Sequence, residues 1–274
     1  MNTESALSSK PNSAEEPIPA VLLVGGLGTR LQPLLPSTPK PLAPVGGRPF
    51  LELLVLQLRS QGIHRLVLCT GHGAEQVEEK LGDGRKWDIQ IEYSRESRPL
   101  GTAGALKLAE RLLLQVPEFL VMNGDSFLEF DFRQFLRFHR GHQGLASMAV
   151  RKVSDASRYG TVQLDASQRV VGFCEKQDTG APGLVNGGVY LFTCGVLPYL
   201  PEGPASLEND VFPRLLEYGV YAAEQEGIFI DIGTPEDYAR AQTLHGRLSQ
   251  AAQIQGQSFL DRDGVINRKA LEGQ

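Results

Sequence analysis

Residues 20–41 read AVLLVGGLGTRLQPLLPSTPKP, an apolar run that breaks into glycines and then carries two cations. The apolar part, residues 20–24, is short, continuous and β-branched at two positions, which favours a buried parallel strand over a helix. Gly25 and Gly26 end this strand at once. The stretch therefore predicts a strand that delivers a glycine-rich loop to the edge of a sheet.

The glycine loop has the composition of an anion-binding site. Gly25, Gly26 and Gly28 lack a Cβ, so their backbone N–H groups can approach an anion closely. Arg30 adds a planar fork of donors that matches phosphate oxygens, and Lys40, placed between two prolines, adds a second cation. An ordinary glycine turn with two solvated cations is the alternative. We predict that the loop binds phosphate.

Two familiar phosphate-binding motifs do not fit this loop. The Walker motif fails because no Gly-Lys-Ser/Thr follows at the required spacing. The dinucleotide fingerprint fails because Leu31 stands where its third glycine belongs, which disfavours a Rossmann oxidoreductase.

Predicted helices and strands alternate after the loop. Residues 50–61 and 74–81 read as helices, and residues 66–69 and 89–93 as strands. This order predicts a parallel sheet with crossover helices, in which ligands lie at the carboxyl ends of the strands. From residue 145 the strands shorten and predict an antiparallel extension over one side of the cleft. We expect a Rossmann-like α/β fold with a mixed, mainly parallel sheet flanked by helices and a small β extension.

A second glycine loop precedes another predicted helix. Residues 98–108, RPLGTAGALKL, place Gly101 and Gly104 around Thr102, directly before a helix expected at residues 105–114. Thr102 could simply cap that helix. Further along, residues 206–219 predict a capped helical stretch that Pro213 interrupts.

Two aspartates are candidate metal ligands. Asp125 follows the strand expected at residues 119–122, and Asp231 lies inside the apolar strand expected at residues 227–232. A charge inside such a run is costly unless it is paired or binds a metal, and Mg²⁺ prefers oxygen ligands. The alternatives are an Asx turn at Asp125 and a helix-capping role for Asp231.

The β extension carries two polar groups of interest. Glu175 and Lys176 pair a carboxylate suited to sugar hydroxyls with a cation suited to a phosphate. Asn186 offers an amide beside two glycines, the second being Gly188, that admit a close ligand. A solvated strand end and a β-bulge are the corresponding structural alternatives.

Composition narrows the partners. The net charge of -5 argues against a nucleic-acid binder, which needs basic surface, so we expect no nucleic acid as partner. No apolar run reaches the length of a membrane span, and the N-terminal residues lack the apolar centre of a signal peptide. We expect a flexible tail at residues 1–17 in a cytoplasmic protein without membrane contact. The 3 cysteines are too scattered to predict a disulfide or metal site.

The first loop also resembles a known family. Residues 25–31, GGLGTRL, and residues 39–52, PKPLAPVGGRPFLE, are similar to the signature of the sugar-1-phosphate nucleotidyltransferases. The resemblance covers roughly residues 18–248, so we expect a nucleotidyltransferase domain of GT-A-like fold at residues 18–250. It implies an enzyme of the EC 2.7.7 type that uses Mg²⁺, a nucleoside triphosphate and a sugar 1-phosphate, and it leaves a homo-oligomer open.

The resemblance also assigns roles to matching residues. It implies catalytic roles for Arg30, Lys40 and Lys176 and metal binding by Asp125 and Asp231. The remaining residues fall into two binding sets: nucleotide binding is expected at Gly25, Gly26, Gly28, Thr29, Leu100, Gly101 and Thr102, and sugar-phosphate binding at Gly160, Glu175, Lys176, Asn186 and Gly188.

The last residues carry a different motif. Residues 258–269, SFLDRDGVINRK, resemble the opening motif of haloacid-dehalogenase-type phosphatases, most of all the heptose bisphosphate phosphatases. Such a phosphatase needs far more chain than follows Asp263, so we predict no phosphatase activity. We interpret residues 251–274 as a tail with a truncated motif. The chain would then be the front part or a relic of a two-domain fusion, which indicates a link to a sugar phosphatase domain or enzyme.

The expected reaction is nucleotidyl transfer from a nucleoside triphosphate to a sugar 1-phosphate. The overall pattern is similar to the mannose- and heptose-1-phosphate guanylyltransferases, and the phosphatase-like motif favours the heptose. Mannose 1-phosphate as acceptor, and uridylyl or thymidylyl transfer, remain alternatives. A non-catalytic regulatory protein that binds a nucleotide sugar is an alternative of another class.

Overall fold

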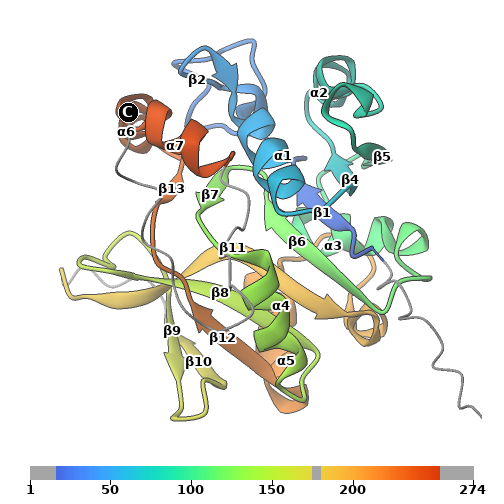
Figure 1. Cartoon of the computed structure of the whole chain (residues 1–274), viewed down its shortest axis with the longest axis vertical. Coiled ribbons are helices and arrows are strands. Elements are labelled where there is room, and N and C mark those ends of the chain that lie inside the picture. The colour runs from blue at the N-terminus through green and yellow to red at the C-terminus, as the bar shows by residue number, and fades with distance from the viewer. Residues whose placement is uncertain (1–16, 175–179, 254–274) are drawn as a thin grey trace, which may run out of the picture.

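A computed structural model describes residues 17–174 and 180–253 of the chain (Figure 1). In these residues the largest sheet has 9 strands. Its centre consists of four parallel strands, in the spatial order β6 (Glu118–Asn123), β1 (Ala20–Leu23), β4 (Arg65–Thr70) and β5 (Gln90–Arg95). The predicted mixed sheet flanked by helices is confirmed.

The strand order creates a crevice beside β1. The chain runs from β1 through α1 (Phe50–Ser60), β4 and α2 (Ala74–Leu81) to β5, and then returns through α3 (Gly101–Leu108) to β6 on the other side of β1. The loops after β1 and β6 therefore diverge, which is where open α/β sheets bind ligands. This topology places the glycine loop at the expected edge.

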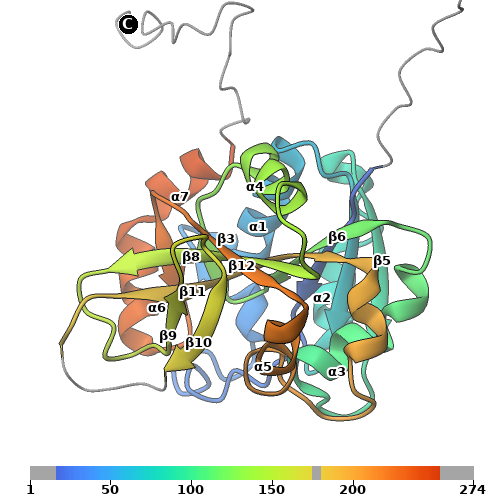
Figure 2. The same cartoon turned by 90° about the horizontal axis from the view of Figure 1, so that it is seen from below.

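Both faces of the central strands are buried, as their continuous apolar runs predict. Ala20 and Leu22 belong to one core cluster, and Val21 belongs to the other. Helices α1, α2, α4 (Phe132–Arg140) and α7 (His245–Ala251) contribute to the first cluster, and α3 and α5 (Phe212–Leu215) to the second. Figure 2 shows α1, α4 and α7 on one side of the sheet and α3 and α5 on the other.

The antiparallel extension begins at β11 (Gly183–Thr193), which pairs antiparallel with β6. It continues through β8 (Ala146–Val153), β9 (Thr161–Leu164) and β10 (Val170–Cys174), in the part of the chain after residue 145 where the extension was predicted. The extension also contains a strand that was not predicted, β12 (Val220–Glu224), which pairs parallel with β8. Its alanines have little β-propensity, so burial against β8, rather than local preference, determines this strand.

A small second sheet brings distant segments together. Strand β13 (Phe229–Asp231) pairs antiparallel with the unpredicted β7 (Ser126–Leu128), with Asp231 opposite Ser126. Helix α6 (Pro235–Thr243) follows, and the Thr234 side chain accepts a hydrogen bond from the Asp237 N–H at its start. A third sheet contains only β2 (Pro44–Val45) and β3 (Arg48–Pro49).

Two helical predictions were wrong in their boundaries. Helix α3 starts at Gly101 rather than at residue 105 and ends at Leu108, because the chain tightens into a 3₁₀ turn at Glu110–Leu112. Thr102 therefore lies inside the first turn and does not cap the helix. Pro213 does not interrupt a helix but lies in the first turn of α5, after a π-helical turn at Leu207–Val211.

None of the helices in the described residues combines the length and apolarity that crossing a bilayer requires. Residues 1–16 of the predicted tail, the Glu175–Lys176 pair and the phosphatase-like motif lie outside the described residues.

Candidate active site

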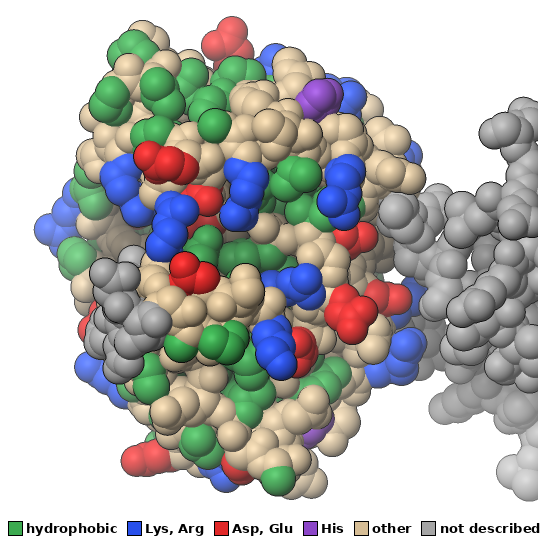
Figure 3. Space-filling view, turned by 90° about the vertical axis from the view of Figure 1, so that its left-hand side faces the viewer, with side chains coloured by type: hydrophobic (Ala, Val, Ile, Leu, Met, Phe, Trp, Pro, Cys, Tyr) green, Lys and Arg blue, Asp and Glu red, His purple; other side chains and the backbone are tan. Residues whose placement is uncertain are grey.

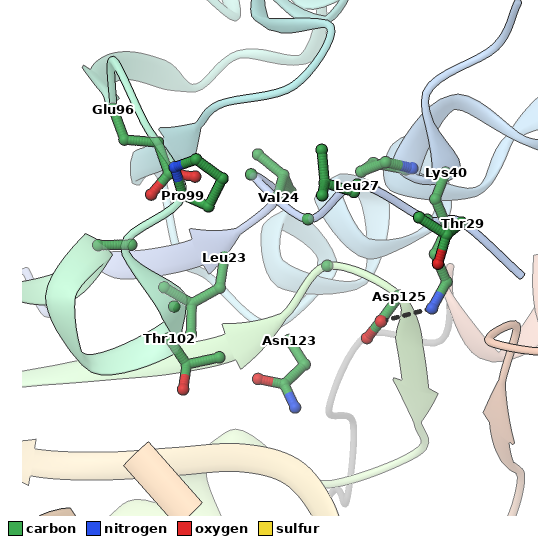
Figure 4. Close-up of a pocket in the computed structure, with 17 residues that line it drawn as sticks. Leu23, Val24, Leu27, Thr29, Lys40, Glu96, Pro99, Thr102, Asn123 and Asp125 are labelled. Carbon is green, nitrogen blue, oxygen red and sulfur yellow. Dashed lines mark hydrogen bonds and ion pairs between the residues drawn. The ribbon is translucent and has the colours of Figure 1, made fainter. Parts of the chain in front are cut away.

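A cavity of about 440 Å³ opens where the loops after β1 and β6 diverge (Figure 4). Its walls come from the glycine loop, the start of α3 and the end of β6. Six residues predicted to bind the nucleotide line it: Gly25, Gly26, Gly28, Thr29, Gly101 and Thr102. Lys40 and Asp125 meet at one end of this cavity, and Glu96 and Pro99 lie at the other.

Gly28 is required by the path of Lys40. Its φ of +63° lies in the left-handed region, and a Cβ on Gly28 would approach the Cβ of Lys40 to 2.8 Å. Lys40 starts a 3₁₀ turn, Lys40–Leu42, between Pro39 and Pro41. The glycine thus allows the lysine to pass beneath the loop and reach the cavity.

Lys40 joins two carboxylates that are far apart in the sequence. Its Nζ lies 2.6 Å from Asp125 Oδ2 and 3.8 Å from Asp231 Oδ1. The backbone fixes this meeting, because the Ile232 N–H donates to the Asp125 carbonyl at 2.9 Å, next to the β7–β13 pair. The predicted proximity of the two aspartates is therefore present in the fold.

The electrostatics of the pair favour a cation between the carboxylates. Burial and the neighbouring Asp125 charge raise the pKa of Asp231, while Lys40 and the Gly233 N–H, which donates to Oδ1 at 2.7 Å, oppose the shift. Among the described residues, no three or more His, Cys, Asp or Glu side chains form a metal-binding group. Two carboxylates suit Mg²⁺ nonetheless, because this ion usually keeps waters and takes its other ligands from substrate phosphates.

A second cavity of about 410 Å³ adjoins this acidic pair through Asp231. Gly160 and Asn186, both predicted at the sugar-phosphate site, line it together with Arg30. Arg30, predicted to bind phosphate, has its guanidinium near Lys40 and Asp231: a Cβ on Gly233 would lie 3.2 Å from Arg30 Nη2 and 3.3 Å from Lys40 Nζ. Both cations therefore point to the junction of the two cavities.

An unpredicted ion pair forms one wall of the second cavity. Arg158 Nη2 donates to Asp237 Oδ2 at 2.7 Å and to Thr234 Oγ1 at 2.9 Å. Asp237 is buried, at 4% exposure, whereas the Arg158 side chain is half-exposed. A buried carboxylate therefore holds Arg158 at the cavity wall. From the sequence, only Gly160 in this segment was predicted to belong to the site.

Glu96 is the other residue that sequence reasoning missed. It follows the carboxyl end of β5, and its Oε2 accepts the Leu100 N–H at 3.0 Å. Its Oε1 packs against the glycine loop, because a Cβ on Gly25 would lie 2.8 Å from it. Burial raises the pKa of Glu96, and the Leu100 hydrogen bond opposes the shift. The sequence signal that could have identified Glu96 is its position directly after the carboxyl end of a strand.

Two predicted residues line neither of these two cavities. Leu100 lies outside the lining of the first cavity, and its N–H is already bound to Glu96. Gly188, at φ +71°, supports the site indirectly: a Cβ there would lie 3.0 Å from Asn123 Nδ2, and its N–H donates to Asn186 Oδ1 at 2.9 Å.

Sequence and structure comparisons find relatives of this chain. Residues 19–246 match the profile of the family described as Nucleotidyl transferase. The chain belongs to this nucleotidyl transferase family. It is 37% identical over 256 residues to mannose-1-phosphate guanylyltransferase catalytic subunit beta of Drosophila pseudoobscura pseudoobscura, covering 92% of this chain and 68% of that protein. A mannose-1-phosphate guanylyltransferase of Mycobacterium tuberculosis is 38% identical over 83% of this chain, which spans 64% of its length.

Two solved structures share the fold of this chain. HddC from Yersinia pseudotuberculosis, complexed with GMP-PN, aligns with a TM-score of 0.73 at 30% identity over 83% of this chain and 99% of that chain. A putative glucose-1-phosphate thymidylyltransferase from Bacillus anthracis aligns with a TM-score of 0.74 at 26% identity, over 83% of this chain and 94% of that chain. The predicted enzyme class and fold are confirmed at the level of this family.

The charges of this nucleotidyl transferase are mixed on the face where α6 and α7 lie. Figure 3 shows lysine and arginine side chains interspersed with aspartates and glutamates on this face, not gathered into one basic patch.

In metal-free protein we expect the Asp231 carboxyl to titrate above the ordinary aspartate pKa, because burial and the neighbouring Asp125 charge both raise its pKa. Asp125→Asn should lower the pKa of Asp231, and Lys40→Met should raise it further. Carboxyl ¹³C shifts in a pH series with EDTA measure both effects. A pKa that is higher in the folded than in the unfolded state stabilises the folded protein at low pH. The contribution of Asp231 to stability should therefore be lost as the pH rises through its folded-state pKa.

The matched control for this titration is Glu79→Gln, which removes an exposed acid from α2 and should leave the pKa of Asp231 unchanged. An Asp231 pKa at or below the ordinary value, or one that neither site variant moves, would contradict the described geometry.

Proposed function

We propose that this nucleotidyl transferase moves the guanylyl group of GTP to a sugar 1-phosphate, forming a GDP-sugar and releasing pyrophosphate. The junction of the two cavities carries the proposal: Lys40, Arg30 and the Asp125–Asp231 pair meet where a triphosphate in one cavity would face a sugar phosphate in the other. Nucleotidyl transfer requires this arrangement, because both reacting groups are anionic and must approach in line.

The reaction needs positioning and charge neutralisation rather than a covalent enzyme intermediate. A sugar-phosphate oxygen forms the new bond to the α-phosphorus of GTP, and the bond from that phosphorus to the β-phosphate's bridging oxygen breaks. Lys40 and Arg30 neutralise charge on the phosphates, and the glycine-loop N–H groups hold the triphosphate. Asp125 and Asp231 would hold Mg²⁺, which when bound screens the charges of both phosphates. Lys176 and Glu175 remain predicted contacts to the acceptor.

Glu96 favours guanine over uracil and thymine. An ionised carboxylate only accepts hydrogen bonds, and guanine presents two adjacent donors, N1–H and the N2 amino group. Uracil and thymine present a single N–H between two carbonyl oxygens, which a carboxylate repels. Glu96 lies at the end of the first cavity opposite Lys40, so a nucleotide with phosphates at Lys40 would place its base there. The GMP-PN in the HddC structure agrees with this choice.

Two sugar 1-phosphates are candidates for the acceptor. The names of the curated relatives support mannose 1-phosphate as acceptor. The phosphatase-like motif at residues 258–269 supports D-glycero-D-manno-heptose 1-phosphate, the second candidate. Both sugars share the manno configuration, so the hydroxyl groups nearest the reacting phosphate would be the same.

Pyrophosphate release tests the function directly. The protein is incubated with Mg²⁺, one nucleoside triphosphate and one sugar 1-phosphate from a panel that contains mannose, heptose and glucose 1-phosphates. We expect release with GTP and a manno-configured acceptor, with kcat/KM at least about tenfold above that for UTP or dTTP, since hydrogen bonds to a charged group contribute about 1.5–3 kcal/mol. Release with no pair would contradict the enzyme, and nucleotide binding without turnover would indicate the regulatory protein instead.

Glu96→Gln tests the base assignment separately. The amide keeps the shape of the side chain but offers a donor to a carbonyl oxygen, so the preference for GTP over UTP should fall by about 10- to 100-fold. Glu92→Gln on the same strand is the control, because Glu92 pairs with Arg65 away from the cavity. An unchanged GTP-to-UTP ratio of kcat/KM in Glu96→Gln would exclude Glu96 as the base-reading residue.

A further inference from the structure

A chain of hydrogen bonds centres on Tyr190. Tyr190 is fully buried on β11, and its hydroxyl accepts from Asn186 Nδ2 at 2.7 Å and donates to Glu208 Oε1 at 3.0 Å. Burial and the Glu208 charge raise the pKa of Tyr190 well above its ordinary value, so the phenol stays protonated. The direction of both hydrogen bonds is therefore fixed.

Glu208 collects further hydroxyl donors from a different part of the fold. Its Oε2 accepts from Thr102 Oγ1 at 3.1 Å and from Ser206 Oγ at 2.9 Å. Thr102 Oγ1 in turn accepts the Leu207 N–H at 2.7 Å. Three hydroxyl groups, those of Tyr190, Thr102 and Ser206, thus donate to the two oxygens of one carboxyl group.

The two ends of this chain reach the two cavities. Thr102 lines the first cavity, where Figure 4 shows it on the wall opposite the glycine loop. Asn186 lines the second. Glu208 lines neither, yet it is hydrogen-bonded directly to Thr102 and through Tyr190 to Asn186.

The segment that carries Glu208 is rigidly attached to α3. Glu208 lies in the π-helical turn Leu207–Val211, a rare conformation that often occurs at functional sites. Just before it, the Ala205 carbonyl accepts the Ala103 N–H at 2.9 Å, and a Cβ on Gly101 would collide with that carbonyl oxygen. The backbone and the carboxylate therefore hold the first turn of α3 together.

We propose that Glu208 is a positioning residue that sets the nucleotide subsite and the sugar subsite at a fixed separation, acting through Thr102 on one side and through Tyr190 and Asn186 on the other. The inference rests on the proposed function, in which a sugar-phosphate oxygen must reach the α-phosphorus in line. Near-attack geometry demands such fixed spacing, because a misplacement of about 1 Å can cost about 100-fold in rate.

The proposal predicts different effects for three substitutions. Glu208→Gln keeps the side-chain shape but disturbs both arms, so kcat should fall about 10- to 100-fold and both KM values should rise. Tyr190→Phe cuts only the arm to Asn186, so it should raise KM for the sugar 1-phosphate and leave KM for GTP within about twofold. Thr102→Val should do the reverse.

Steady-state kinetics with each substrate varied in turn, together with thermal unfolding of every variant, measures these effects. Glu217→Gln removes a nearby acid whose side chain is outside the network and should leave kcat and both KM values unchanged. A purely structural role would lower the unfolding temperature of Glu208→Gln and Tyr190→Phe without separating the two KM values. That result, or a folded Glu208→Gln variant with wild-type kinetics, would overturn the proposal.

Calorimetric binding of GTP and of the sugar 1-phosphate, each alone, separates this inference from the proposed function. If the unmodified protein binds both ligands but releases no pyrophosphate, the proposed function fails. Binding alone then tests the inference, because Tyr190→Phe should weaken the affinity for the sugar 1-phosphate but not the affinity for GTP. Equal losses of affinity for both ligands in Tyr190→Phe would overturn it.

Discussion

The site depends on one interaction, the ammonium group of Lys40 between the carboxylates of Asp125 and Asp231. Burial and the like charge of Asp125 both raise the pKa of Asp231, so an unpaired second charge at this position is unfavourable. Lys40 offsets the repulsion in the described state. A divalent cation would offset it more strongly, which would leave the lysine available to substrate phosphates. The same geometry therefore explains both why the acids tolerate their proximity and why they suit a metal.

Several levels of structure serve to keep these three side chains together. The switch in strand order beside β1 opens the crevice, and the loop after β1 carries Lys40 back into it past Gly28. The β7–β13 pair then brings Asp231 to Asp125 across more than a hundred residues of sequence. On either side lie a cavity that ends at Glu96 and a cavity walled by Arg158, and the Glu208 network spans both. The junction is thus a property of the whole fold.

Local sequence was sufficient to predict much of the fold and part of the site. The glycine loop, the central strands and the helices α1 and α2 follow from apolar runs and glycine stops, and the two acids from their positions at strand ends. It was insufficient where tertiary contact decides: β7 and β12 form because partners cover them, and α3 begins at Gly101 because the Ala205 carbonyl approaches it. Glu96 and the Arg158–Asp237 pair gained meaning only when folding placed them at cavity walls. Arg30 lies at the junction, not inside the nucleotide cavity, because the loop turns after Thr29.

Divalent-metal binding at the acidic pair is the most direct test of the account. Mn²⁺ binding to the protein with a non-hydrolysable GTP analogue can be followed by electron paramagnetic resonance in the unmodified protein, in Asp125→Asn and in Asp231→Asn, with Glu79→Gln as control. Loss of a residue that merely supports a metal site typically costs about 10- to 100-fold in affinity, so each aspartate variant should weaken Mn²⁺ binding at least about tenfold. Unchanged Mn²⁺ affinity in Asp231→Asn would contradict the claim that the fold brings the two acids together to hold a metal between the substrates.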